Sequence, residues 1–164
     1  MADVIRVAVL YGFGINCDHE TKAVFEMAGA QAERIHVNEL VNGDKTLADY
    51  HIMAVPGGFS FGDHLGSGRL LGNRLRFGIR DMVQEFVKSG KLVIGICNGF
   101  QVLCESGLLP GTLMSNDHLQ FRCEWVNLHI ENTSSPFTNA TNRGQVLRIP
   151  ISHGEGNYFA EPDT

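Results

Sequence analysis

The residue best placed to do chemistry is Cys97, which lies in the run Gly95-Ile96-Cys97-Asn98-Gly99 between an apolar stretch and a helical one. A nucleophile at a sharp strand-to-helix turn needs glycines two residues before and after it, because side chains there would clash. The helix N-terminus supplies partial positive charge that favours a thiolate, and its backbone N–H groups can hold an oxyanion. The spacing predicts a nucleophilic cysteine; the alternative is a buried structural one.

A second glycine-rich feature, Pro56-Gly57-Gly58, ends another apolar run, residues 51–55. Parallel strands present their carboxyl ends at one edge of a sheet, where open α/β sheets bind ligands. We therefore expect a backbone N–H of this segment to face Cys97, although a plain turn would also explain adjacent glycines. The remaining cysteines are predicted to be structural: Cys17, Cys104 and Cys123.

The elements that must position these residues alternate between strand and helix. Asp18 can cap the first helix, and Gly29 suits the position just after its end. The last strand before Cys97 is almost wholly apolar, so we expect a central strand buried on both faces. The alternation predicts a doubly wound, mostly parallel α/β sheet. Strands are predicted at residues 4–10, 33–37, 51–55 and 91–96, and helices at 18–28, 69–88 and 98–105.

The pattern changes after Pro110. Residues 122–130 and 145–151 have strand-like composition and no helix between them. We expect them to form an antiparallel extension at one end of the sheet. The 164 residues are enough for one domain, residues 1–164, or for most of one.

The composition is that of a globular protein with a net charge of −5, which argues against nucleic acid or an anionic membrane as a partner. No apolar run is long enough to span a membrane, and no signal peptide is recognisable. Four cysteines without a CxxC pair favour a reducing cytoplasm. One basic cluster is either a solvated helix face or a patch for an acidic partner: Arg69, Arg74, Arg76 and Arg80.

Several motifs carry a resemblance to a known family. They are PGGFSFGD at residues 56–63, GICNGFQ at 95–101, GLLPG at 107–111 and LRIPISHGEGNY at 147–158. Together they resemble the class I (triad) glutamine amidotransferases. Within that class they are similar to the glutaminase subunits of phosphoribosylformylglycinamidine synthase, over essentially the whole chain. The resemblance implies a flavodoxin-like, doubly wound sheet with an antiparallel extension.

The resemblance also implies a mechanism. Cys97 would attack the amide of glutamine, release ammonia and leave a glutamyl thioester that water hydrolyses. Backbone N–H groups of Gly58 and Asn98 would hold the oxyanion. Where the family often has Asn-x-Ser-x-Arg/Lys-Phe, this chain reads NDHLQF at residues 116–121, which puts His118 in place of the serine. The residues implied to bind glutamine are Gly57, Gln101 and Phe121.

The implied partners belong to the same complex in purine biosynthesis. A large ATP-dependent synthetase subunit would use the ammonia to make formylglycinamidine ribonucleotide, and a small bridging subunit would accompany it. ATP and magnesium would act on the synthetase, so no cofactor is expected in this subunit. Neither nucleic acid nor a membrane is an expected partner.

The catalytic His and Glu of the family lie in a His-Pro-Glu motif, and no such motif occurs here. The chain therefore looks truncated at its C-terminal end, and we expect it to be inactive alone because the thiol lacks its general base. His153 and Glu155 share the His-x-Glu spacing but match a different family segment, HGEG. Their expected role is at an interface or along the path of ammonia; local turn structure and catalysis remain alternatives.

Three other interpretations remain open. Gly12-Phe13-Gly14 follows a predicted strand, as in a dinucleotide-binding motif, but Cys17 stands where the third glycine would be. Another hydrolase of the same architecture could also carry an elbow cysteine. Finally, the chain could be a folded but inert fragment.

Overall fold

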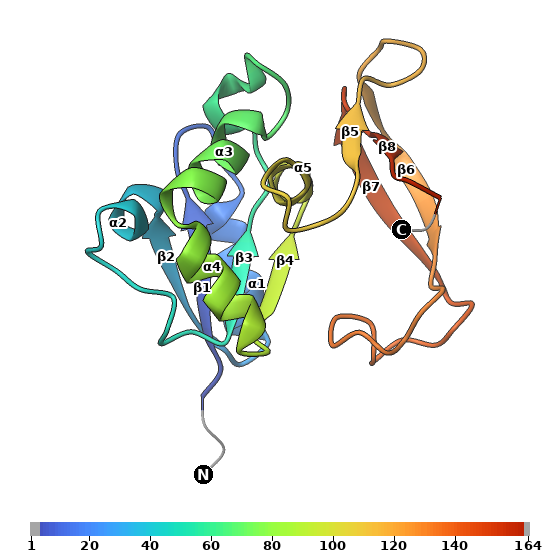
Figure 1. The fold of residues 1–164 in the computed structure, drawn as a ribbon. Helices are drawn as coiled ribbons and strands as arrows, with labels where there is room; N and C mark the ends of the chain where they lie inside the picture. Colours follow the sequence, from blue (N-terminus) through green and yellow to red (C-terminus); the bar gives the residue numbers. More distant parts are fainter. Residues whose placement is uncertain (1–3, 163–164) are drawn as a thin grey trace. The chain divides into compact units, whose positions relative to one another are not determined.

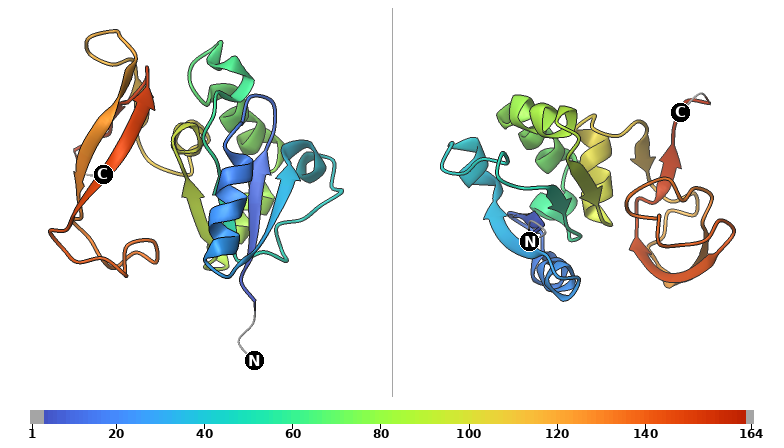
Figure 2. Two further views of the ribbon diagram at one scale, coloured as in Figure 1. Left: turned by 180° about the vertical axis from the view of Figure 1, so that it is seen from behind. Right: turned by 90° about the horizontal axis from the view of Figure 1, so that it is seen from below.

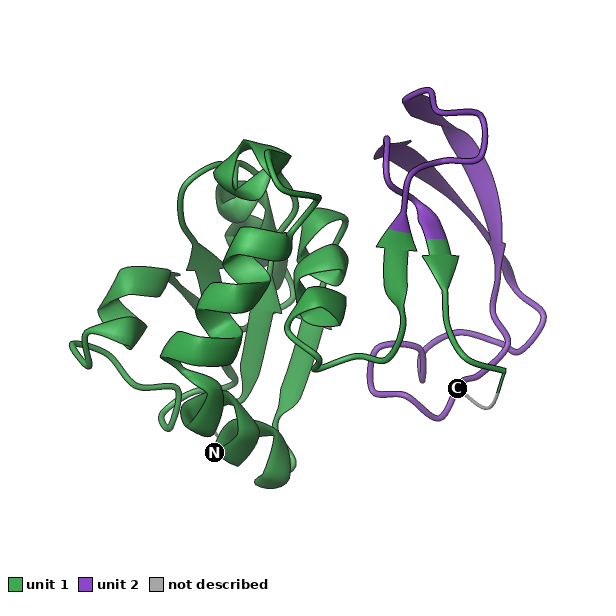
Figure 3. Ribbon diagram, turned by 45° about the horizontal axis from the view of Figure 1, so that its top comes forward, with its two compact units in different colours: residues 1–113, 158–164 green, residues 114–157 purple. Residues whose placement is uncertain are grey.

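The computed structural model describes residues 4–162 and divides into two compact units (Figures 1 and 3). Unit 1 holds the residues up to 113 and from 158 onward, and unit 2 holds residues 114–157. The helices are α1 (Asp18–Met27), α2 (Val37–Val41), α3 (Arg69–Gly78), α4 (Arg80–Lys88) and α5 (Asn98–Glu105), with a 3-10 helix η1 (Ser60–Asp63). The strands are β1 (Arg6–Tyr11), β2 (Gln31–His36), β3 (Ile52–Val55), β4 (Leu92–Gly95), β5 (Thr112–Met114), β6 (Arg122–His129), β7 (Val146–His153) and β8 (Asn157–Phe159).

Unit 1 is built on a four-stranded parallel sheet in the order β2-β1-β3-β4. Val7 and Val9 of β1 point to one face, where they pack with Phe25 of α1. Ala8 and Leu10 point to the other face and join a larger core with α3, α4 and α5. The views from the front and from behind show α1 alone on its face of the sheet (Figures 1 and 2). The predicted doubly wound, mostly parallel α/β fold is therefore confirmed.

Three local predictions are wrong in instructive ways. The strand before Cys97, β4, lies at the edge of the four-stranded sheet, and all its residues are only half-buried. The helix predicted over residues 69–88 is broken at Ile79, whose φ of −135° is not helical. Asp18 does not cap α1: Cys17 is the N-cap residue, and the buried Asp18 carboxylate instead pairs with Arg34. Gly29, by contrast, follows α1 with a φ of +89°, as predicted.

Unit 2 consists mainly of the antiparallel pair β6 and β7, in register from Arg122 opposite His153 to His129 opposite Val146. The two predicted strands therefore exist and pair with each other. They do not extend the parallel sheet, because β6 and β7 form a two-stranded sheet of their own. β5 and β8 form a further two-stranded sheet that the sequence did not predict.

Among residues 4–162, no helix combines the length and the apolar character that crossing a membrane would require.

A polar cluster fastens the segment before β3 to strand β2. The Tyr50 hydroxyl donates a hydrogen bond to a Glu33 carboxylate oxygen, and Lys45 Nζ lies 2.7 Å from the other oxygen. Hydrogen bonds from Lys45 and Tyr50 lower the pKa of Glu33. Burial, and then the bond to Glu33, raise the pKa of Tyr50 to about 12. The Tyr50 phenol is therefore neutral in the folded state at neutral pH.

We expect the Tyr50→Phe variant to lose about 1–2 kcal/mol of unfolding free energy at neutral pH, because Glu33 loses a donor. A folded-state pKa above the ordinary value of 10.0 means that the Tyr50 contribution is complete below that pH and is lost as pH rises toward about 12. Urea unfolding of both proteins across this range should therefore show their stabilities converging. A difference that stays constant with pH would contradict this account.

Candidate active site

The predicted elbow lies where the sequence places it, between the end of β4 at Gly95 and the start of α5 at Asn98. Cys97 is the N-cap residue of α5 and has a φ of 54° and a ψ of −115°. A non-glycine residue with positive φ is strained, and such strain gathers at functional sites. The Cys97 side chain is exposed, so the buried structural alternative is wrong.

The two flanking glycines allow α5 to approach the strand ends closely. A Cβ built on Gly99 would lie 1.8 Å from the carbonyl oxygen of Val55, at the end of β3. A Cβ built on Gly95 would lie 2.6 Å from the Gly99 carbonyl oxygen and 2.7 Å from a Leu103 methyl. Any side chain at either position would push the helix off the sheet, as the Gly-x-Cys-x-Gly spacing predicts.

The second glycine segment contacts Cys97 directly. A Cβ built on Gly57 would lie 3.2 Å from the Cβ of Cys97. The Gly57 carbonyl accepts hydrogen bonds from the N–H groups of Asn16, at 3.4 Å, and Cys17, at 3.2 Å. The peptide bond between Gly57 and Gly58 is trans, so the Gly58 N–H points in the direction opposite to the Gly57 carbonyl. That N–H forms no hydrogen bond in the described part of the chain.

Asn98 fastens this glycine loop to the helix that carries Cys97. Its side chain is buried, and its amide oxygen accepts a hydrogen bond from the Ser60 N–H at 3.0 Å. Its amide nitrogen donates to Gln101 Oε1 at 2.9 Å and to Asp63 Oδ1 at 3.4 Å. The backbone N–H of Asn98 lies in the first turn of α5, where the helix itself offers no acceptor. One residue therefore joins both halves of the site.

Sequence reasoning missed three residues of this site. Ser60 and Asp63 lie in the glycine loop and bind the Asn98 side chain; polar residues inside the PGGFSFGD motif were the available signal. Cys17 was expected to be structural, yet it is exposed, and its Sγ lies 3.6 Å from the position a Gly57 Cβ would take. Cys123 is also exposed, contrary to expectation, whereas Cys104 is buried as predicted.

The remaining predicted site residues lie in unit 2. His153 Nδ1 lies 3.0 Å from Asn116 Oδ1, and the Asn116 side-chain nitrogen donates to the backbone oxygens of Gln120 and His153. The buried Asn116 thus ties the 116–121 segment to the HGEG segment. Phe121 is exposed, and Glu155 is half-buried. This network gives His153 and its neighbours a structural role within unit 2.

The glycine pair of the dinucleotide alternative has a structural explanation. The Gly14 carbonyl accepts a hydrogen bond from the Phe59 N–H at 2.7 Å, and a Cβ on Gly14 would lie 2.0 Å from the Phe59 carbonyl oxygen. Gly14 therefore packs against the loop that follows Gly57 and Gly58. No phosphate is needed to explain a glycine at this position.

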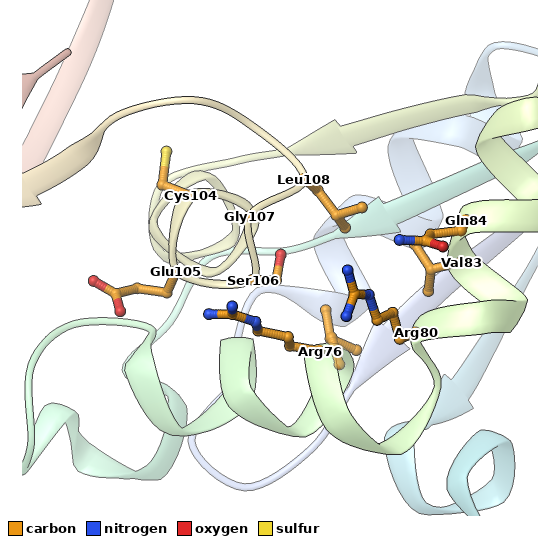
Figure 4. A pocket seen from close by; sticks show the side chains of 10 residues that line it. Arg76, Arg80, Val83, Gln84, Cys104, Glu105, Ser106, Gly107 and Leu108 are labelled. Atoms are coloured by element: carbon orange, nitrogen blue, oxygen red, sulfur yellow. The ribbon is translucent and has the colours of Figure 1, made fainter. Parts of the chain in front are cut away.

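The four arginines of the basic cluster make different contacts. Arg69 pairs with Glu105 at 3.3 Å, and Arg74 binds Asn38 Oδ1 at 2.5 Å. Arg76 and Arg80 instead line a cavity of about 230 Å³. Figure 4 shows both side chains reaching toward the last turn of α5, at the end opposite Cys97, where a positive charge complements the helix dipole.

Within residues 4–162, no cluster of three or more His, Cys, Asp or Glu could hold a metal ion.

The close approach at Gly99 leads to a stability test. We expect Gly99→Ala to lose about 3 kcal/mol or more of unfolding free energy, because its methyl group cannot coexist with the Val55 carbonyl. Gly12→Ala is the matched control, since a Cβ there has its nearest neighbour at 3.9 Å, and it should change stability by less than about 1 kcal/mol. Equal urea midpoints for the two variants would contradict the packing described for α5.

Comparison with known proteins agrees with this geometry. A family model for the CobB/CobQ-like glutamine amidotransferase domain matches residues 4–164. The phosphoribosylformylglycinamidine synthase subunit PurQ of Methanococcus maripaludis is 42% identical, over 98% of this chain and 62% of that protein. The subunit PurQ of Moorella thermoacetica is 47% identical, over 98% of this chain and 65% of that protein. The chain thus spans less than two thirds of the length of these relatives.

Solved structures give the same result. The structure of PurLQS from Thermotoga maritima aligns with a TM-score of 0.87 and 38% identity, over 98% of this chain and 72% of that one. A glutamine amidotransferase from the same organism, at 14% identity and a TM-score of 0.62, shares the fold. The resemblance read from the sequence motifs is confirmed: the chain belongs to the family of CobB/CobQ-like glutamine amidotransferase domains.

Proposed function

We propose that this chain carries the glutaminase chemistry of a phosphoribosylformylglycinamidine synthase. The Cys97 sulfur attacks the side-chain amide carbon of glutamine, and the tetrahedral intermediate expels ammonia and leaves a glutamyl thioester. Water then attacks the thioester and releases glutamate. The observation that carries this proposal is the exposed, strained Cys97 between β4 and α5, in contact with Gly57.

The oxyanion of the intermediate would be held by two backbone N–H groups. The Gly58 N–H is a candidate because the Asn16 and Cys17 bonds to the Gly57 carbonyl fix the orientation of its peptide. The Asn98 N–H is the second, because it opens α5. Each such donor contributes about 2.7–4 kcal/mol to stabilising the transition state. The Asn98 side chain would keep the two donors at a constant separation.

The glutamine itself would bind beside these groups. Gly57 leaves room next to the Cys97 Cβ for the substrate amide. Gln101 is buried, its amide oxygen accepts from Asn98, and it would help to hold the glutamine substrate. The family resemblance adds Phe121 to the residues that would bind glutamine.

The ammonia would pass to a large ATP-dependent synthetase subunit that makes formylglycinamidine ribonucleotide in purine biosynthesis. A small bridging subunit would complete the complex, and ATP and magnesium would act on the synthetase. The names of the relatives support this assembly, since they are subunits of that synthase and one solved structure is of PurLQS. His153 and Glu155 would serve the subunit interface or the path of ammonia. The complex would work in the cytoplasm.

Turnover needs a group that accepts the Cys97 proton. The Cys97 Sγ forms no hydrogen bond to any residue that the structure describes, and the His-Pro-Glu motif that the resemblance implies as the source of the general base does not occur in these 164 residues. We therefore propose that these 164 residues bind and react with glutamine analogues but release almost no ammonia alone.

Labelling with 6-diazo-5-oxo-norleucine tests the proposal, because this glutamine analogue alkylates a thiol only where glutamine binds. We expect mass spectrometry to find the label on Cys97, with glutamine slowing its attachment and Cys97→Ser abolishing it. Cys104→Ser, at a buried thiol, is the matched control and should label normally.

Parallel labelling with iodoacetamide, a general thiol reagent, tests the two alternative interpretations. If it modified Cys97 readily while the glutamine analogue left Cys97 untouched, another elbow-cysteine hydrolase would replace the glutaminase. If neither reagent modified Cys97, the inert-fragment interpretation would hold.

A further inference from the structure

Cys17 and Cys97 both lie close to Gly57, a residue that has no side chain. A Cβ built on Gly57 would lie 3.2 Å from the Cys97 Cβ and 3.6 Å from the Cys17 Sγ. The Cys17 N–H also donates to the Gly57 carbonyl at 3.2 Å, so the backbone around Cys17 is fixed against this glycine. Both cysteines are exposed. The Cys17 sulfur and the Cys97 Cβ, each on an exposed residue, therefore lie beside the same glycine.

The surroundings of the two thiols differ. Cys97 begins α5, where the helix dipole stabilises negative charge on a neighbouring group. Burial, followed by the negative charges of Glu20, Cys97 and Asp18, raises the pKa of Cys17. Cys17 therefore stays a protonated thiol at neutral pH, and peroxide does not oxidise it first, because peroxide reacts with thiolates.

We propose that Cys17 is a resolving cysteine for Cys97, and that the pair forms a reversible disulfide when the nucleophile is oxidised by a peroxide. This site is independent of what Cys97 does to glutamine, since it rests on the positions of the Cys17 Sγ and the Cys97 Cβ beside Gly57. The disulfide removes the nucleophile from use and keeps it from further oxidation.

The chemistry balances in two steps. The Cys97 thiolate attacks hydrogen peroxide: an S–O bond forms, the O–O bond breaks, hydroxide leaves, and the sulfur loses two electrons to the peroxide. The Cys17 sulfur then attacks the Cys97 sulfenic acid, an S–S bond forms, the S–O bond breaks and water leaves with the Cys17 proton. A dithiol reductant then reduces the disulfide by thiol–disulfide exchange, which restores both protein thiols and converts the reductant into its own disulfide.

Peptide mapping after treatment with hydrogen peroxide tests the proposal on the folded chain. We expect a cross-linked peptide pair that joins Cys17 to Cys97 and disappears on addition of dithiothreitol. In Cys17→Ser the cross-link should be absent, and dimedone should trap the Cys97 sulfenic acid, which otherwise proceeds to sulfinic acid. Cys123→Ser, at another exposed thiol, is the control and should keep the cross-link.

A second variant separates the geometry from the loss of a thiol. Gly57→Ala keeps both sulfurs but adds a methyl group that would contact the Cys17 Sγ and crowd the Cys97 Cβ, so the yield of cross-link should fall at least several-fold. Circular dichroism of each variant checks that the fold is retained. Irreversible oxidation of Cys97 at the same rate in the unmodified chain and in Cys17→Ser would overturn the proposal. So would a cross-link that Gly57→Ala leaves undiminished.

Discussion

The close packing of helix α5 against the ends of β3 and β4 is the constraint on which the rest of the site depends. Gly99 lies so near the Val55 carbonyl that no side chain fits. The chain must therefore turn from strand to helix within two residues, and Cys97 takes a φ of 54°. Such a conformation costs about 1–3 kcal/mol. The buried Val102 and Leu103 of α5 offset this cost through the core that they share with the sheet.

The turn at Cys97 forms a reactive site only if the glycine loop that contains Gly58 is held at a fixed distance from it. Asn98 provides the link, because its buried side chain binds the Ser60 N–H and the Asp63 carboxylate of the glycine loop. Leaving a buried partner such as the Ser60 N–H unpaired costs about 1–3 kcal/mol. The same interactions that stabilise the loop therefore also fix the position of Gly58 relative to Cys97. Asn98 thus stabilises the loop and, in the proposed function, also positions an oxyanion donor.

Much of the site could be predicted from sequence because its features are local. The elbow depends on glycines two residues from Cys97, and α5 itself has the predicted bounds, Asn98–Glu105. The position of β4 at a sheet edge could not be predicted, because an apolar run has the same composition in a central strand and in an edge strand that is half-buried. The break at Ile79 was missed for a similar reason, since both helices continue one amphipathic pattern.

Contacts between segments far apart in the sequence were the least predictable. Cys17 reaches Gly57 only because β1 and β3 are neighbours in the sheet, so that the turn before α1 meets the loop after β3. No pattern of residue spacing in the sequence indicates that these two segments are in contact. The same holds for Asn116 and His153, which the pairing of β6 with β7 brings together. Residue types identified the candidate chemistry, and topology decided which candidates share a site.

In the proposed reaction, the Gly58 and Asn98 N–H groups face the oxygen of the carbonyl that Cys97 attacks. The most direct measurement is a crystal structure of the chain after Cys97 has reacted with 6-diazo-5-oxo-norleucine, whose adduct retains a carbonyl next to the new bond. The account predicts that this carbonyl oxygen lies within about 3 Å of both nitrogens. An oxygen that faces solvent, or that binds neither nitrogen, would contradict it.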